Sequence, residues 1–201
     1  MKELLIASNN EGKIKEFRKL FQAFNIHVSS LRDLENPIDI PETGTTFHEN
    51  AQLKSEGIST RFGKMVIADD SGLVIDALNG RPGIISARFA GSEKNDSKNI
   101  DKVLDELKNV PMLKRTARFV CVLAISAPGV QTQFVEGVCE GIITEERIGD
   151  QGFGYDPIFY LPGLGKTMAE LTSEEKNKIS HRAIAMQKLM DVLPKWMEGE
   201  S

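Results

Sequence analysis

The sequence predicts an α/β protein built on a mixed β-sheet with flanking helices. The chain opens with a β-α-β pattern, in which an apolar strand at Glu3–Ala7 leads into a helix and then into a short strand at 26–29. Further along, apolar runs at 115–127 and 131–143 flank the turn dipeptide Pro128-Gly129, which indicates a long antiparallel hairpin. A parallel unit and an antiparallel hairpin in one chain predict a mixed sheet.

Apolar residues at helical spacing predict the helices. Those of the first helix follow the initial strand and are Ile14, Phe17, Leu20, Phe21 and Phe24. Thr46 and Glu49 have the spacing of a capping box, so a second helix is expected from there to about Phe62. A third helix is expected at Asp96–Leu107. Thr172 and Glu175 cap a last helix, whose apolar stripe is Ala183, Met186, Leu189, Met190 and Leu193.

Composition excludes several classes of protein. The chain has 201 residues, 40% of them hydrophobic, and a formal net charge of -4, so a single domain spanning residues 1–201 is expected. The negative charge argues against a general binder of nucleic acid or of anionic membranes. Cys121 and Cys139 lie in strand-like runs and are interpreted as core residues rather than metal ligands. The apolar run at 4–7 is too short for a signal peptide or a membrane span, which predicts a cytoplasmic protein.

The segment 65–75 carries the residues that are the clearest candidates for a functional site. Two apolar runs flank Asp69-Asp70-Ser71-Gly72, which predicts a buried strand that stops at these four residues. The carboxylates would then lie at the rim of the sheet, where open α/β sheets bind ligands. Because side chains alternate along a strand, we expect Asp69 and Asp70 to point to opposite sides. Taken alone, the motif is equally consistent with a polar turn between two strands.

The loop Ser8–Lys13 lies between the first strand and the first helix, and it is a candidate anion site. Free backbone N–H groups and the helix dipole both favour negative charge there. Lys13 has the wrong sign for the dipole, which makes sense if a bound anion compensates it. The alternative is an Asn-rich cap with a solvated lysine.

Another unusual loop is Gly152–Pro157. Its glycines allow a ligand to approach the backbone, and Phe153 and Tyr155 offer flat surfaces for a nucleobase.

Elsewhere, Glu42 and Asp70 form an acidic pair of the kind that suits Mg²⁺. The cations that would suit several phosphates are Lys13, Lys54, Arg88, Lys176 and Arg182. Together these groups predict a nucleoside triphosphate handled with Mg²⁺.

Four motifs, in the same order along the chain, resemble those of the inosine/xanthosine triphosphate pyrophosphatase family. They are Ser8-x-Asn10-x-x-Lys13, Asp69–Leu73, Phe153–Pro157 and Glu175-Lys176-Asn177-x-x-Ser180-His181-Arg182. The resemblance implies an elongated fold of two lobes with a central active-site cleft, and a homodimer. It also implies Mg²⁺-dependent hydrolysis of dITP, ITP and XTP to the monophosphate and pyrophosphate, which removes deaminated purines from the nucleotide pool.

The resemblance also implies roles for particular residues. Asp70 would be catalytic, as the acceptor that activates water, and Glu42 and Asp70 would bind Mg²⁺. Asp69 is interpreted as a structural or auxiliary carboxylate. The residues expected to contact the substrate are Ser8, Asn9, Asn10, Glu11, Gly12, Lys13, Lys54, Ser71, Arg88, Phe153, Gly154, Tyr155, Asp156, Lys176, His181 and Arg182.

Two other functions remain open from the sequence. One is a related septum-inhibitor (Maf-like) pyrophosphatase acting on pyrimidine or methylated nucleotides, against which the Phe153–Asp156 and Ser180–Arg182 motifs argue. The other is a non-catalytic nucleotide- or RNA-binding module. The acidic pair Glu42 and Asp70 argues against a pure binder, and the acidic net charge argues against RNA.

Overall fold

The apolar runs of the sequence form the strands of one seven-stranded sheet, ordered β2-β1-β3-β4-β5-β6-β7. The computed structural model describes residues 3–22, 26–34 and 40–198. The strands are β1 Glu3–Ile6, β2 His27–Ser30, β3 Val66–Ile75, β4 Thr116–Ala127, β5 Val130–Ile143, β6 Phe159–Leu161 and β7 Lys166–Thr167. β1 pairs in parallel with β2 and β3, whereas β6 pairs antiparallel with β5 and β7. The predicted mixed α/β fold is therefore confirmed.

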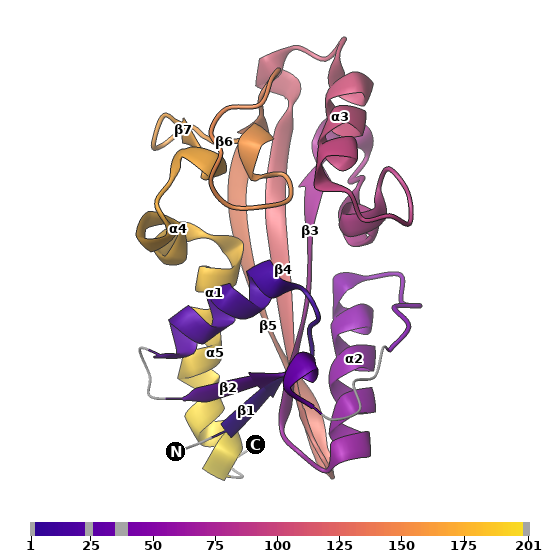
Figure 1. The fold of residues 1–201 in the computed structure, drawn as a ribbon, viewed down its shortest axis with the longest axis vertical. Coiled ribbons are helices and arrows are strands. Elements are labelled where there is room, and N and C mark those ends of the chain that lie inside the picture. The colour runs from indigo at the N-terminus through magenta and orange to yellow at the C-terminus, as the bar shows by residue number, and fades with distance from the viewer. Residues whose placement is uncertain (1–2, 23–25, 35–39, 199–201) are drawn as a thin grey trace. The chain divides into compact units, whose positions relative to one another are not determined.

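The first three helices lie where apolar spacing and capping residues predict them (Figure 1). The helices of the structure are α1 Glu11–Gln22, α2 Phe47–Phe62, α3 Asp96–Leu107, α4 Ser173–Ile179 and α5 His181–Glu198. Thr46 caps α2 by accepting a hydrogen bond from the Glu49 N–H, and Thr172 caps α4 in the same way through the N–H of Glu175. None of the described helices has the length and apolar character needed to cross a membrane.

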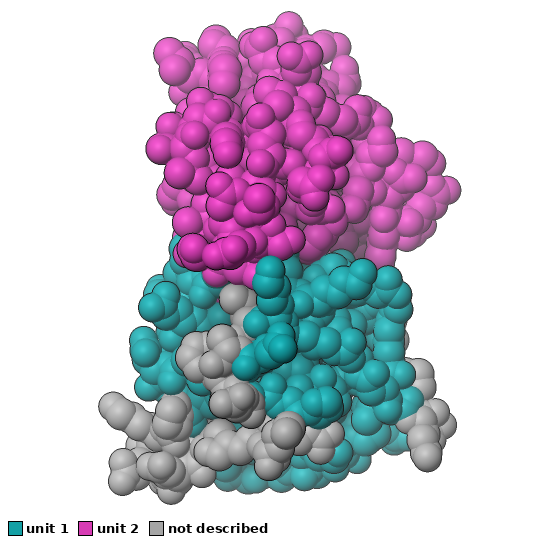
Figure 2. Space-filling model, turned by 60° about the vertical axis from the view of Figure 1, so that its left-hand side comes forward, with its two compact units in different colours: residues 1–70, 121–137, 183–201 teal, residues 71–120, 138–182 magenta. Residues whose placement is uncertain are grey.

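The chain divides into two compact units, coloured separately in Figure 2. Unit 1 comprises residues 1–70, 121–137 and 183–201, and unit 2 comprises residues 71–120 and 138–182. The long strands β3, β4 and β5 each contribute residues to both units. The single domain predicted from length stays a prediction, and the chain packs as two compact units.

In unit 1 the sheet is covered on both faces, and side-chain alternation assigns each residue to a face. Leu4 and Ile6 of β1 pack in one cluster with residues of α1 and α5. Leu5 and Ala7 belong to a second cluster with Ile58 of α2. Figure 1 shows α2 on one side of β3, and α1 and α5 on the other. The two-sided burial explains why β1 and the first three residues of β3, Val66–Ala68, are almost continuously apolar.

In unit 2 a single core joins β3, α3 and the segment from β5 to α4. α3 contributes Ile100, Val103 and Leu107 from one helical face. Phe119 of β4 and Phe159 of β6 are in ring contact, with centroids 4.4 Å apart. Both cysteines, Cys121 and Cys139, are buried, as expected for core residues.

The structure corrects two predictions of local structure. The strand through Asp69-Asp70 does not stop at those residues, because β3 continues through Ser71 and Gly72 to Ile75. It is the neighbouring strand β1 that ends there: its last pair with β3 is Ile6 with Ile67. The carboxylates thus lie beyond the end of a partner strand, in the middle of their own.

The last helix, predicted as one, is two. Ser180 has an extended backbone (φ -67°, ψ 154°) between α4 and α5, so the capping box starts α4 while the apolar stripe belongs to α5. The predicted core position Phe24 lies outside the described residues.

We expect Gly141→Ala to destabilise the protein by about 1–3 kcal/mol, because a Cβ there overpacks the core. An ideal Cβ on Gly141 would lie 2.6 Å from the Phe159 ring and 2.7 Å from the Tyr160 carbonyl oxygen. Gly163→Ala is the matched control, because its Cβ would meet no atom within 4 Å. Urea unfolding of both variants measures the difference; equal stability would contradict the packing described here.

Candidate active site

Asp69 and Asp70 point to opposite sides of β3, as alternation predicts. Both are buried, at 1% and 5% exposure. The Asp69 carboxylate lies 2.8 Å from the Lys13 ammonium of α1. The Asp70 carboxylate instead contacts α2, through the side chains of Asn50 and Lys54. Two adjacent carboxylates are therefore held by helices on different faces of the sheet.

Lys54 joins three acceptors in unit 1. Its ammonium lies 3.0 Å from Glu42 Oε1 and 3.7 Å from Asp70 Oδ1, and it donates to the Asp69 carbonyl oxygen. Glu42 precedes α2 by five residues and is half-buried. The lysine thus brings together the two carboxylates that the sequence singled out as a metal pair.

Asn50 is a site residue that sequence reasoning missed. Its Nδ2 donates to Asp70 Oδ2 at 3.2 Å, and its Oδ1 accepts from the Gly44 N–H at 2.8 Å. A Cβ on Gly44 would lie 2.8 Å from that same Oδ1, so the contact requires glycine. Asn50 and Lys54 are four residues apart and share one face of α2. No signal in the sequence marked Asn50, because its full burial and its contact with Asp70 arise only in the folded chain.

Burial and charge set the ionisation of this cluster. Burial raises the pKa of Asp70, and the ammonium groups of Lys54 and Lys13 only partly oppose that shift. Burial also disfavours the charged form of Lys54, but Asp69, Asp70 and Glu42 together outweigh it and raise the pKa of the lysine. The result is a lysine that stays charged beside an aspartate that is more basic than usual.

The loop from Ser8 to Lys13 forms a capped helix start. Asn10 Oδ1 accepts from the Lys13 N–H at 3.1 Å, and Ser8 Oγ accepts from the Asn10 N–H at 3.2 Å. Asn9 and Glu11 are exposed, and Glu11 pairs with Arg32. The charge on Lys13, which the sequence explained by a bound anion, is balanced within the protein by Asp69.

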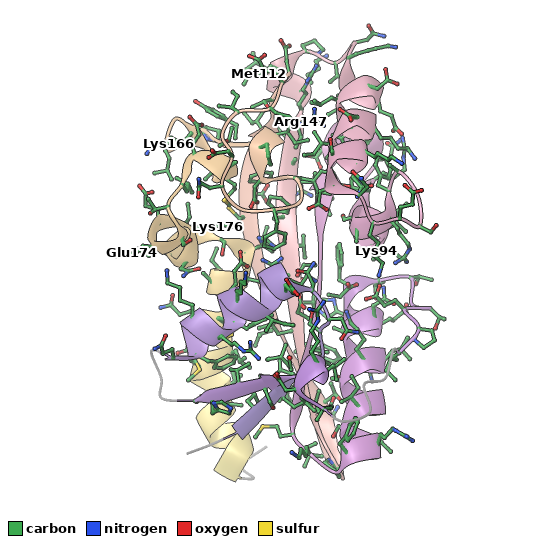
Figure 3. The ribbon with its side chains drawn as sticks, in the orientation of Figure 1. Lys94, Met112, Arg147, Lys166, Glu174 and Lys176 are labelled. Atoms are coloured by element: carbon green, nitrogen blue, oxygen red, sulfur yellow. The ribbon has the colours of Figure 1, made fainter. Side chains whose placement is uncertain are left out.

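A second group of predicted site residues meets in unit 2 around Asp156. Its buried Oδ2 accepts from the Lys176 ammonium at 2.7 Å and from the Phe153 N–H at 3.0 Å. The Lys176 ammonium and the Arg182 guanidinium carbon lie 4.8 Å and 5.3 Å from the centroid of the Phe153 ring. Figure 3 marks Lys176 on α4. Two cations therefore flank one half-buried aromatic ring.

The loop backbone is fixed by glycine and by its neighbours. Gly152 has φ +80°, and a Cβ on it would lie 2.0 Å from Asp156 Oδ2, so no other residue fits there. The Gly154 N–H donates to Asp96 of α3 at 2.8 Å. These contacts hold the backbone on both sides of Phe153.

Tyr155 and His181, both predicted to contact substrate, lie inside unit 2. The Tyr155 hydroxyl donates to the Ser86 carbonyl oxygen at 2.7 Å, and burial raises the pKa of that phenol. The His181 ring stacks on Phe119 at 4.8 Å, with 16° between the planes. In the structure these side chains support the loop and the start of α5.

Arg88, at the end of the short helix Gly83–Arg88, and Ser71 on β3 are half-buried.

The predicted residues thus form two groups, one in each unit. The carboxylates of Glu42 and Asp70 in unit 1 fit a magnesium ion, because that ion binds through one or two carboxylates and completes its shell with substrate oxygens and water. Among the described residues, no cluster of three or more acidic, histidine or cysteine ligands exists to hold a metal by itself. The pair Glu42 and Asp70 therefore suits a metal that arrives with a phosphate ligand.

These observations describe an α/β protein with a group of buried acidic and basic side chains in each of its two units. Comparison with known proteins identifies the group: residues 4–192 match the model of the Ham1 family, and the chain belongs to that family. A dITP/XTP pyrophosphatase of Geobacillus kaustophilus is 58% identical, covering 94% of this chain and 93% of the relative. The Bacillus subtilis protein of the same name is 55% identical, with coverages of 96% and 98%.

Solved structures agree with the assignment. The Staphylococcus aureus Ham1 protein is 48% identical, with a TM-score of 0.84 and full coverage of both chains. A HAM1 protein from Coxiella burnetii is 42% identical, with a TM-score of 0.87, covering 97% of this chain and 100% of the other. The predicted family and fold class are therefore confirmed.

We expect Lys54→Met to raise the pKa of Asp70 further, because the substitution removes the largest influence that favours the ionised carboxylate. A carboxyl ¹³C titration of the metal-free protein measures the shift. Lys98→Met, which removes an exposed ammonium in unit 2, is the control for net charge. An Asp70 pKa that stays the same or falls in Lys54→Met would contradict the electrostatics described here.

Proposed function

We propose that this protein hydrolyses the deaminated purine nucleotides dITP, ITP and XTP to the monophosphate and pyrophosphate. The similarity to enzymes named dITP/XTP pyrophosphatase over nearly the whole chain supports the reaction and its substrate class. The observation that carries the proposal is the carboxylate pair of Glu42 and Asp70, held around Lys54. A protein that only bound nucleotides would have no need for that buried acidic pair.

Under this proposal the triphosphate binds to groups of unit 1. Lys13, the N–H groups at the start of α1 and Lys54 supply positive charge for phosphate oxygens. Glu42 and Asp70 would hold Mg²⁺, which when bound neutralises phosphate charge and favours the departure of pyrophosphate. Such charge neutralisation and in-line positioning are the main requirements of phosphoryl chemistry.

Asp70 is the proposed acceptor for the proton of the attacking water. Its raised pKa makes the carboxylate a stronger base than an exposed aspartate. The two oxygens of Asp70 have different partners, since Oδ2 accepts from Asn50 while Oδ1 faces Lys54. This arrangement fixes the plane of the carboxylate, which is what a positioned base needs.

The base is proposed to bind beside Phe153 in unit 2, where Lys176 and Arg182 supply donors. Hypoxanthine and xanthine carry a 6-oxo acceptor where adenine carries an amino donor. With adenine bound, the donor group of Lys176 or Arg182 would face the amino donor of the base. Two donors facing each other are costly in a buried site. Because Asp156 holds the Lys176 ammonium, the position of that donor is fixed before substrate arrives.

A cytoplasmic homodimer is part of the same proposal. The family resemblance of the four motifs supports the homodimer. Light scattering of the purified protein measures the oligomeric state, and a monomeric mass at micromolar concentration would remove the homodimer from the proposal.

The test is pyrophosphate release from ITP, XTP, GTP, ATP, dUTP and UTP, with and without Mg²⁺. We expect Mg²⁺-dependent release from ITP and XTP, with the matching monophosphate formed and GTP and ATP spared. Release mainly from pyrimidine nucleotides would indicate the Maf-like reaction and overturn the base assignment. No release from any nucleotide would leave a binding protein and overturn the proposal.

We expect Arg182→Met to reduce the preference for ITP over ATP by about 10- to 100-fold, because one donor to the 6-oxo group is lost. The ratio of kcat/KM for the two nucleotides measures the effect. Arg147→Met is the matched control, since that arginine binds Ser97 and Asp101 on the surface of unit 2. An unchanged ratio in Arg182→Met would remove Arg182 from base selection.

A further inference from the structure

The short turn that carries Arg88, residues 87–90, has its backbone fixed at four groups. The Ala87 carbonyl oxygen accepts from Asn99 Nδ2 at 3.1 Å, and the Ala90 N–H donates to Asn99 Oδ1 at 2.7 Å. The Arg88 carbonyl accepts from the Gly91 N–H at 3.0 Å, and the Phe89 carbonyl accepts from the Lys102 ammonium at 2.7 Å. We call residues 87–90 the Arg88 turn.

Most of these contacts come from one stripe of α3. Asn99, Lys102 and Glu106 are spaced three and four residues apart and so face the same way. Lys102 also lies 4.3 Å from the centroid of the Phe89 ring, and Glu106 pairs with Arg81 at 2.9 Å. α3 therefore holds the segment around the turn through polar side chains, while its apolar face packs in the core of unit 2.

Asn99 has a particular place in this stripe. It is 2% exposed, and its amide bonds the backbone of Ala87 and of Ala90, the residues on either side of the pair Arg88-Phe89. A side chain bonded to the backbone before and after this pair restricts the direction of the Arg88 Cα–Cβ bond. The other member of the stripe that bonds the turn, Lys102, contacts the carbonyl and the ring of Phe89.

We propose that Asn99 is a positioning residue: it holds the turn that carries Arg88 and so sets the direction in which Arg88 meets the substrate. This inference rests on the proposed function and on the prediction from the sequence that Arg88 contacts the substrate. Asn99 acts through Arg88 and touches no reacting atom. Nothing in the sequence pattern marked it, because an asparagine in the first turn of a helix is an ordinary residue there.

The same end of α3 also binds the loop around Phe153. Asp96 accepts from the Gly154 N–H at 2.8 Å, and the Tyr155 hydroxyl donates to Ser86, directly before the Arg88 turn. The Arg88 turn and the base loop therefore share their supports within unit 2. Loosening the turn should weaken the alignment of the nucleotide rather than the chemical step.

The experiment is a double-mutant cycle on ITP hydrolysis with Arg88→Ala, Asn99→Ala and the combined variant. We expect Asn99→Ala to raise KM about 10-fold with a smaller change in kcat, and to have no further effect in the Arg88→Ala background. Asn95→Ala is the matched control: Asn95 caps the same helix through the Lys98 N–H but makes no contact with the turn. It should leave KM unchanged.

The outcomes separate this inference from its premise. If Arg88→Ala lowers kcat/KM but Asn99→Ala does not, or if the two effects simply multiply, the positioning role of Asn99 is wrong while the proposed function stands. If Arg88→Ala is fully active, Arg88 is no substrate contact and the inference falls with that premise. Should Asn99→Ala fail to fold, the same double-mutant cycle is run with Asn99→Ser. Amide exchange at Ala90 then measures whether the turn has loosened, and the kinetic outcomes are judged in the same way.

Discussion

The alternation of side chains along β3 is the constraint on which the site depends. One step along the strand turns Asp69 toward α1 and Asp70 toward α2, so two neighbouring carboxylates meet different lysines. The Asp69 pair with Lys13 holds the start of α1, where phosphate is proposed to bind. Asp70 is the proposed proton acceptor, and its carboxylate is held by α2 instead. A shift of β3 by one residue would turn Asp69 toward α2 and Asp70 toward α1, and would so exchange the contacts of the two carboxylates.

The ionisation of Asp70 shows what such a site costs in stability. Its pKa in the folded protein lies above the ordinary value, so the native state holds this proton more tightly than the unfolded chain does. The corresponding stability is present at low pH and is lost as the pH rises through the folded pKa. The charged form that the proposed reaction needs is thus the less stable one, and Lys54 offsets part of that penalty.

Much of the fold could be predicted from local signals. The third helix was predicted at Asp96–Leu107, and α3 has these bounds. The prediction that the strand stops at Asp69-Asp70-Ser71-Gly72 was wrong because polar residues and glycine are typical of turns. In the structure, contacts of the two carboxylates with Lys13 and Lys54 allow the strand to continue. Residues such as Asn50 and Asn99 could not be found, since their role depends on backbone groups that come close only after folding.

The most direct test of this account compares Asp69→Asn with Asp70→Asn in ITP turnover and thermal unfolding. The account predicts that Asp70→Asn loses turnover while keeping its fold. Asp69→Asn should lower the unfolding temperature and raise KM through Lys13, yet retain most of kcat. Loss of kcat in Asp69→Asn together with an active Asp70→Asn would reverse the assignment of the two carboxylates and contradict the account.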